Sequence, residues 1–158
     1  MFASRMIACF LSLAALLYPA LAPAELGRAS ASVRDDAARM KGALAAHQVG
    51  NATRHDITRA NGGLVHEFAN ADGQVFAVTW NGPGKPDLRS LLGPYFQPLQ
   101  GTHVSFGRMM HSLRHPLTVN QADLKIQMAG HMGWFHGVAY IPSLTPPGFS
   151  LGELDPTK

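Results

Sequence analysis

The sequence predicts an α+β fold built on an antiparallel sheet, and three observations support this prediction. Residues 54–80 alternate in polarity and are interrupted by turn-forming residues, which is typical of a three-stranded meander. An amphipathic stretch precedes them at residues 32–47, and two or three further strand-like stretches follow a proline-containing helical corner. Because helices and strands do not alternate one by one, a doubly wound parallel sheet is disfavoured.

The first 24 residues have the features of a secretory signal. A positive region ends at Arg5, an apolar run spans residues 6–21, and the small residues Ala22 and Ala24 suit signal peptidase. The run is short for a membrane span, which needs about 20 apolar residues. We therefore expect cleavage and an exported protein, periplasmic or extracellular, that is not an integral membrane protein. Cys9, the only cysteine, would leave with the signal, so no internal disulfide is expected.

The remaining residues are expected to form one domain, residues 25–143, followed by an extended or disordered proline-rich tail, residues 144–158. Basic and acidic side chains nearly balance after residue 24. This balance argues against a nucleic-acid partner.

Residues 32–47 are predicted to form the N-terminal helix. Ser32 is placed to cap it, and Asp35 and Asp36 fall in its first turn, where the helix dipole favours negative charge. The stop is expected at Gly50 and Asn51. The apolar stripe consists of Val33, Ala37, Met40 and Leu44.

The first hairpin of the meander has two possible registers. A loop at Gly62 and Gly63 sets Ile57 opposite Phe68 and Thr58 opposite Glu67. A loop at Asn61 and Gly62 would instead set Asp56 opposite Glu67, and directly opposed like charges are unfavourable. The first register is therefore preferred.

The second hairpin is expected to turn at residues 71–73. This turn sets Phe68 opposite Phe76, with His66 opposite Val78 and Leu64 opposite Trp80. Phe68, Phe76 and Trp80 are then predicted to share one apolar face. That face needs a cover.

The helical corner at residues 86–99 is the predicted cover. Pro86 suits a helix start, and Gly93 with Pro94 breaks the helix. The apolar side chains expected to cover the meander are Leu88, Leu91, Leu92, Tyr95, Phe96 and Leu99. Further on, strands are predicted from Leu117, through the alternating residues Leu124, Ile126 and Met128, and over residues 134–141, with a bend at residues 130–133.

Several short motifs follow one another in order after the signal-like segment. They are GQVFAVTWNGP at residues 73–83, PDL at 86–88, LLGPYF at 91–96, DL at 123–124, and GHMG leading to AYIPS at 130–143. This combination resembles a proteobacterial family called domain of unknown function 2844. The resemblance implies export and a single domain, and it implies no activity, cofactor or catalytic residue.

Few residues suggest chemistry. Residues 103–107, HVSFG, only partly match the G-x-S-x-G nucleophile motif and lack its large α/β context, so Ser105 is interpreted as a loop serine. The carboxylates Asp35, Asp36, Asp72 and Asp87 occupy helix starts or a turn and are interpreted as structural. His66, between Leu64 and Phe68, is interpreted as a buried or edge histidine bonded to the backbone.

Two clusters of methionine and histidine suit copper by ligand type. They are Met109, Met110, His111 and His115, and Met128, His131, Met132 and His136. Their spacing does not show that the side chains converge, and Met128 alternates as a core residue does.

The sequence is best interpreted as an exported binding or interaction protein of the cell envelope without catalysis. Its partner is another envelope protein, a polymer or a small ligand. The alternative is a periplasmic copper-binding protein, and the third hypothesis is a hydrolase. No catalytic, cofactor-binding or metal-binding residue is assigned, and no cofactor is expected.

Overall fold

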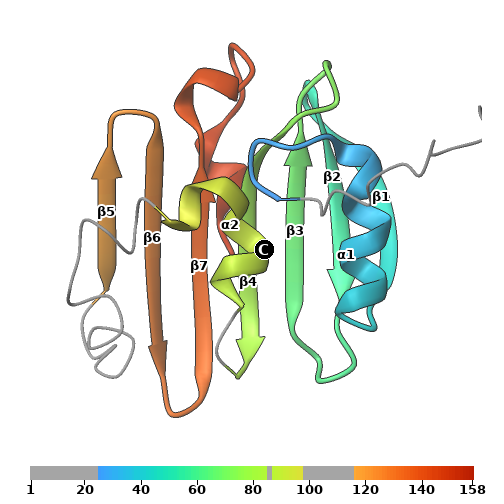
Figure 1. The fold of residues 1–158 in the computed structure, drawn as a ribbon, viewed down its shortest axis with the longest axis vertical. Helices are drawn as coiled ribbons and strands as arrows, with labels where there is room; N and C mark the ends of the chain where they lie inside the picture. The colour runs from blue at the N-terminus through green and yellow to red at the C-terminus, as the bar shows by residue number, and fades with distance from the viewer. Residues whose placement is uncertain (1–24, 85–86, 98–115) are drawn as a thin grey trace, which may run out of the picture.

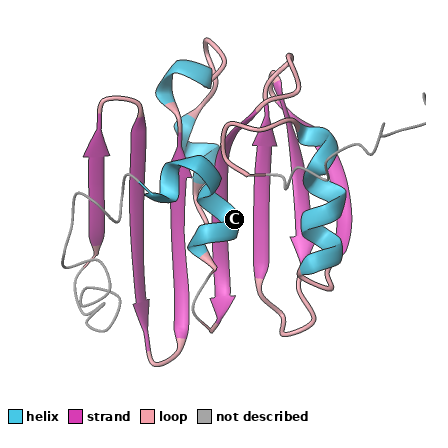
Figure 2. Ribbon diagram, viewed as in Figure 1, coloured by secondary structure: helices cyan, strands magenta, loops and turns pink. Residues whose placement is uncertain are grey.

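The computed structural model describes residues 25–84, 87–97 and 116–158. It contains a seven-stranded antiparallel sheet with short helices, a mostly β architecture that is broadly α+β as predicted (Figures 1 and 2). The strands are β1 (Ala43–Val49), β2 (Ala52–Thr58), β3 (Leu64–Ala69), β4 (Val75–Pro83), β5 (Leu117–Gln121), β6 (Leu124–His131) and β7 (Trp134–Tyr140). The helices are η1 (Ser30–Ser32), α1 (Val33–Arg39), α2 (Leu88–Leu92), η2 (Gly93–Tyr95), η3 (Pro142–Leu144) and η4 (Leu151–Leu154).

The sheet consists of two meanders joined side by side. The strand order is β1-β2-β3-β4-β7-β6-β5, so β4 and β7 pair in the centre. In Figure 1, α1 and α2 lie in front of the sheet, α1 over the first meander and α2 over the junction of the two. The three later strands and the break after α2 agree with the sequence prediction.

The N-terminal helix is shorter than predicted. It ends at Arg39, and the predicted second half, residues 43–47, belongs to edge strand β1. Lys41 has a φ of 50°, which terminates the helix, and a Cβ on Gly42 would lie 2.6 Å from Ile57 Cγ2. Pairing of β1 with β2 therefore outweighs the weak helical preference of an alanine-rich segment.

Two smaller expectations about this helix were wrong. Ser32 occupies the N-cap position, but its hydroxyl donates to the Ala29 carbonyl at 2.7 Å and makes no cap hydrogen bond. Gly50 and Asn51 form the turn between β1 and β2 rather than a helix stop. Asp36, one of the two acids in the first turn, is buried.

Both proposed registers of the first hairpin were wrong. Ile57 pairs with Val65 and Thr58 with Leu64, because residues 59–63 form a five-residue loop. The loop closes through Arg59 N–H donating to the Gly63 carbonyl at 2.8 Å and Gly63 N–H donating to the Asn61 side chain at 3.0 Å. The like-charge conflict is avoided in a third way, since Asp56 faces His66.

The second hairpin is also one residue out of the predicted register. Phe68 pairs with Ala77, His66 with Thr79 and Leu64 with Asn81, and a bulge lies between Phe68 and Ala69. A one-residue slip moves a side chain to the other face of a sheet. Trp80 consequently lies on the face covered by helices, and Phe68 and Phe76 lie on the opposite face. The predicted shared face was wrong.

The two faces have separate apolar cores. On the helix-covered face, Trp80 packs in one cluster with Leu88 and Leu91. The predicted cover by the helical corner is therefore confirmed for Trp80 but not for Phe68 and Phe76. On the other face, Phe68 and Phe76 pack with Phe149 from the C-terminal segment, whose Leu154 is buried. No helix in the described ranges is long and apolar enough to span a membrane.

Candidate functional site

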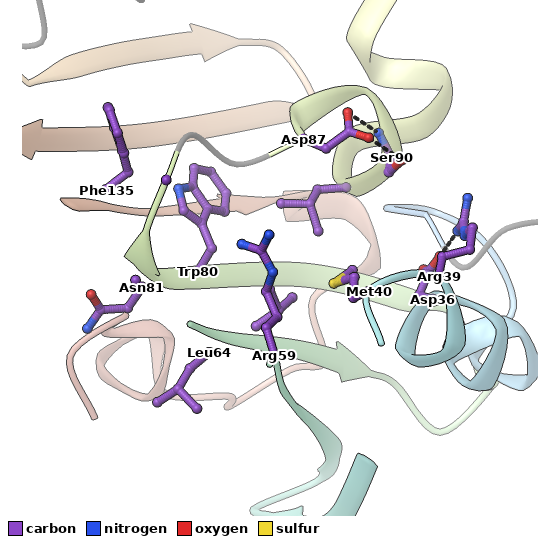
Figure 3. Close-up of a pocket in the computed structure, with 14 residues that line it drawn as sticks. Asp36, Arg39, Met40, Arg59, Leu64, Trp80, Asn81, Asp87, Ser90 and Phe135 are labelled. Carbon is purple, nitrogen blue, oxygen red and sulfur yellow. Dashed lines mark hydrogen bonds and ion pairs between the residues drawn. The ribbon is translucent and has the colours of Figure 1, made fainter. Parts of the chain in front are cut away.

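A cavity of about 200 Å³ lies on the helix-covered face, where α1, α2 and the β2–β3 loop meet the sheet (Figure 3). Its floor is formed by β3 and β4, and Phe135 of β7 closes one side. The residues that line it are Asp36, Arg39, Met40, Arg59, Leu64, Val65, Trp80, Asn81, Gly82, Gly84, Asp87, Ser90, Leu91 and Phe135. It is thus walled by both meanders and both α-helices.

Trp80 occupies the centre of the cavity wall. Its partner across the sheet is Gly137, and a Cβ at Gly137 would lie 2.4 Å from Trp80 Cζ2. The missing side chain therefore lets the indole lie over β7. Trp80 is only 3% exposed, yet its Nε1 has no hydrogen-bond partner among the described residues. A buried N–H without an acceptor costs about 1 to 3 kcal/mol.

Arg59 enters the cavity from the β2–β3 loop. Figure 3 shows its side chain extending toward Trp80. The side chain is half-buried, and it forms no ion pair or hydrogen bond with any described residue. Its neighbours Leu64 and Val65 are apolar, so its charge is not compensated locally.

The other charged residues of the cavity already have partners. Arg39 forms an ion pair with the buried carboxylate of Asp36. Asp87 caps α2, because one carboxylate oxygen accepts from the N–H groups of Arg89 at 3.2 Å and Ser90 at 3.3 Å. The second oxygen accepts from the Ser90 hydroxyl at 2.8 Å. The predicted structural role of Asp87 is confirmed.

The rest of the wall is apolar except for Asn81, whose side-chain oxygen accepts from the Trp134 indole at 2.6 Å. Met40, at the end of α1, and Leu91 of α2 face the cavity with Phe135. Phe135 lies over Gly130, where a Cβ would be 2.5 Å from Phe135 Cδ1. Two glycines thus shape the aromatic side of the cavity, Gly130 beneath Phe135 and Gly137 beneath Trp80.

Glu67 is a buried acid beneath α1, on the same face of the sheet as the cavity. It is 1% exposed and lies opposite His55 on β2 and Val78 on β4. Burial raises the pKa of Glu67 to about 8, although the positive charge of Arg39 opposes the rise. The carboxyl is therefore protonated at neutral pH. Burial also lowers the pKa of His55, against the raising effect of Asp56.

A polar cluster lies on the opposite face of the first meander, around Asp56. The carboxylate is 2.6 Å from His66 Nδ1, 2.8 Å from Arg54 Nε and 3.3 Å from His47 Nε2. Burial opposes ionisation of Asp56, but hydrogen bonds and charges from Arg54 and His66 together lower its pKa. His66 is buried as predicted, but its partner is this carboxylate rather than the backbone.

Asp56, His66 and Thr79 lie directly opposite one another on β2, β3 and β4. Acid, base and hydroxyl in that order are the components of a nucleophilic triad. Thr79 is fully buried, however, and does not line the cavity, so a substrate carbonyl has no approach to its hydroxyl. The arrangement does not favour the hydrolase hypothesis, and Ser105 lies outside the described residues.

The second Met/His cluster does not converge. Met128 is buried in the helix-side core, whereas Met132 is fully exposed at the β6–β7 turn. His131 and His136 alternate with Gly130 and Phe135 and so face the other side of the sheet. Within the described ranges, no three His, Cys, Asp or Glu side chains are grouped to hold a metal ion. The first cluster, residues 109–115, lies outside the described residues.

Sequence reasoning missed the cavity. It treated Arg59 as part of a hairpin and Trp80 as a core residue, and it gave Gly130 and Gly137 no separate role. The one available signal was this pair of glycines in strands rich in aromatic residues, because a glycine within a strand often marks a place where another group approaches the backbone closely. The five-residue loop that aims Arg59 into the cavity could not be deduced from the turn residues alone.

The comparisons with known proteins identify a family and no individual relative. The model of the family described as protein of unknown function (DUF2844) matches residues 22–154. Neither a curated protein nor a solved structure matches the chain significantly.

Proposed function

The chain belongs to the DUF2844 family of proteins of unknown function, and we propose that it is an exported protein that binds a small molecule in the cavity beside Trp80. The observation that carries the proposal is the Nε1–H group of Trp80, a buried residue of the cavity wall, which has no acceptor among the residues that the structure describes. Buried polar groups in folded proteins are nearly always paired. Because the Nε1 atom has almost no accessible surface, a ligand oxygen in the cavity would reach it through a small shift of the indole and then supply the missing partner.

The cavity has the character of a binding site for a small ligand. Most such sites combine apolar and aromatic walls with a few polar groups that fix orientation. Here Met40, Leu91 and Phe135 supply the apolar wall, and Trp80 and Arg59 supply the polar groups. None of the lining residues forms an acid, base and nucleophile arrangement, which favours binding over catalysis.

Export is part of the same proposal. The signal-like features of residues 1–24 support it, and so does the involvement of the next residues in the fold. Leu26 is fully buried, and Gly27 N–H donates to the Val75 carbonyl at 2.7 Å. Cleavage after Ala24 would therefore leave a chain whose first residues already belong to the domain.

Native mass spectrometry of the protein purified from the periplasm or culture medium of its own host tests both parts. We expect a mature mass that corresponds to residues 25–158, together with a retained low-mass ligand. Trp80→Phe, which removes the N–H group, should lose the ligand, and the control variant Arg34→Gln, at an exposed position of α1 outside the cavity, should keep it. A ligand-free wild-type protein would contradict the binding function, and an uncleaved chain found only inside the cell would contradict export.

A further inference from the structure

The chemistry of the cavity specifies its ligand more narrowly, on the premise that the proposed binding function holds. We propose that the ligand is a small monocarboxylate with one planar apolar ring, bound through its carboxylate by Arg59 and by the Trp80 Nε1–H group. Three properties of the cavity carry this inference: its charge, its donors and its size.

The charge of the cavity favours one negative group on the ligand. Asp36 and Arg39 neutralise each other, and the Asp87 carboxylate is held by three hydrogen bonds from the first turn of α2. Arg59 is the cation among the described lining residues that has no counterion. A half-buried guanidinium in low-dielectric surroundings gains most from an anion placed beside it.

The two carboxylates also limit how much negative charge the ligand can carry. A phosphate monoester at neutral pH has close to two negative charges. The second charge would share the cavity with Asp36 and Asp87, without a further unpaired cation among the described lining residues to offset it. A carboxylate brings one charge, and its two oxygens match the planar fork of an arginine.

The unpaired donors suit the same group. Arg59 and the Trp80 indole are donors and have no acceptor atom. The acceptors of the lining are already engaged, Asp36 by Arg39, Asp87 by the first turn of α2, and Asn81 Oδ1 by the Trp134 indole at 2.6 Å, which disfavours a ligand ammonium or amide N–H. One carboxylate oxygen can accept from the guanidinium and the other from the indole N–H. The buried donor of Trp80 is then paired, which removes the cost of leaving it unsatisfied.

The size and the walls of the cavity select the remainder of the molecule. An apolar protein cavity of about 150 Å³ accommodates a benzene ring. The cavity here, about 200 Å³, has room for one ring and one small polar substituent. Phe135 and Trp80 offer aromatic surfaces, and Met40 offers a flexible thioether that adapts to an aromatic edge.

The test uses benzoate, benzamide and phenyl phosphate as probes of equal ring size. Calorimetric titration of the wild-type chain keeps the hydrogen bond from the Trp134 indole to the cavity residue Asn81. We expect saturable binding of benzoate, at least tenfold tighter than that of benzamide or phenyl phosphate. In ¹H–¹⁵N spectra of the same protein, the Trp80 indole resonance should shift as benzoate binds.

Variants at Arg59 separate the charge from the fold. Arg59→Gln should weaken benzoate binding at least tenfold and leave benzamide binding nearly unchanged, and Arg59→Lys should retain part of the preference. Arg34→Gln, an exposed position on α1 outside the cavity, is the matched control and should change neither. Circular dichroism and thermal unfolding establish that each variant is folded.

Two results would overturn the ligand class. If benzamide binds as well as benzoate and Arg59→Gln changes nothing, the cavity binds neutral molecules, and the broader binding function stands. If none of the three probes binds at millimolar concentration, the aromatic monocarboxylate is wrong. The binding function itself is then decided by the ligand retained in the natively purified protein.

Discussion

Replacing the buried acid Glu67 by glutamine should stabilise the protein, and by an amount that grows with pH. Glu67 is 1% exposed, and its pKa rises from the ordinary value of 4.5 to about 8 on folding. Glutamine has nearly the same shape as the protonated acid but never ionises. The substitution therefore removes the cost of keeping a proton on Glu67.

The sign of the effect follows from proton binding. Between pH 4.5 and 8 the folded chain holds a proton on Glu67 that the unfolded chain releases. Stability contributed by this residue is therefore complete below pH 4.5 and is lost as the pH rises toward 8. One pKa unit corresponds to about 1.4 kcal/mol, so the loss is about 1 kcal/mol at pH 5, about 3 at pH 7 and about 4.5 at pH 8.5.

Urea unfolding of wild type and Glu67→Gln at these three pH values measures the effect. The difference in free energy of unfolding between the two proteins isolates Glu67, since His55, Asp56 and other titrating groups are common to both. Glu153→Gln, a substitution of the same type at a solvent-facing side chain of the C-terminal segment, should change stability by less than about 0.5 kcal/mol at every pH. A pH-independent difference for Glu67→Gln, or one below about 1 kcal/mol at pH 8.5, would refute the reasoning.

Three further predictions concern packing and charge. Phe76→Ala should lower the free energy of unfolding by about 3 to 5 kcal/mol in urea titrations, because Phe76 is fully buried; a loss below about 1 kcal/mol would contradict its place in the core. Gly137→Ala should cost about 1 to 3 kcal/mol and change Trp80 fluorescence in the Trp134→Phe background, because the new Cβ would lie 2.4 Å from the indole; an unchanged spectrum would mean that the ring does not depend on this glycine. Asp56→Asn should lower stability near neutral pH and flatten the decline of stability in acid. The lowered pKa of Asp56 contributes stability at pH values above the ordinary pKa of an aspartate, and this contribution is lost as the pH falls. Parallel pH profiles of the two proteins would show that the His66 contact does not hold the carboxylate ionised.

The elements of the fold could be predicted from the sequence better than their pairing. Polarity patterns and turn residues located the meander, the helical corner and the three later strands. Register depends on loop length and on bulges, and neither is encoded by the turn residues alone. The loop at residues 59–63 shifts the pairing of β2 with β3. The bulge at Phe68 shifts the pairing of β3 with β4, which moves Trp80 to the opposite face from Phe68.

The site was less predictable than the fold for a related reason. Arg59 and Trp80 are separated in sequence and meet only because β2, β3 and β4 pair in the observed register. Asp36 was assigned from sequence to a helix start, which is correct, but its burial and its pair with Arg39 depend on how α1 lies on the sheet. Single-sequence patterns contain no direct record of such tertiary contacts.

The central pairing of β4 with β7 has a consequence for how fast the protein folds. Even the nearest pair across this junction, Pro83 and Trp134, is about 50 residues apart in the chain. Closing such a long loop costs entropy before the contacts repay it, so we expect refolding in milliseconds to seconds rather than microseconds. Until β7 arrives, β4 presents an open and largely apolar strand edge, the kind of edge that recruits other chains. Yield on refolding should therefore depend on protein concentration more strongly than the stability of the native sheet suggests.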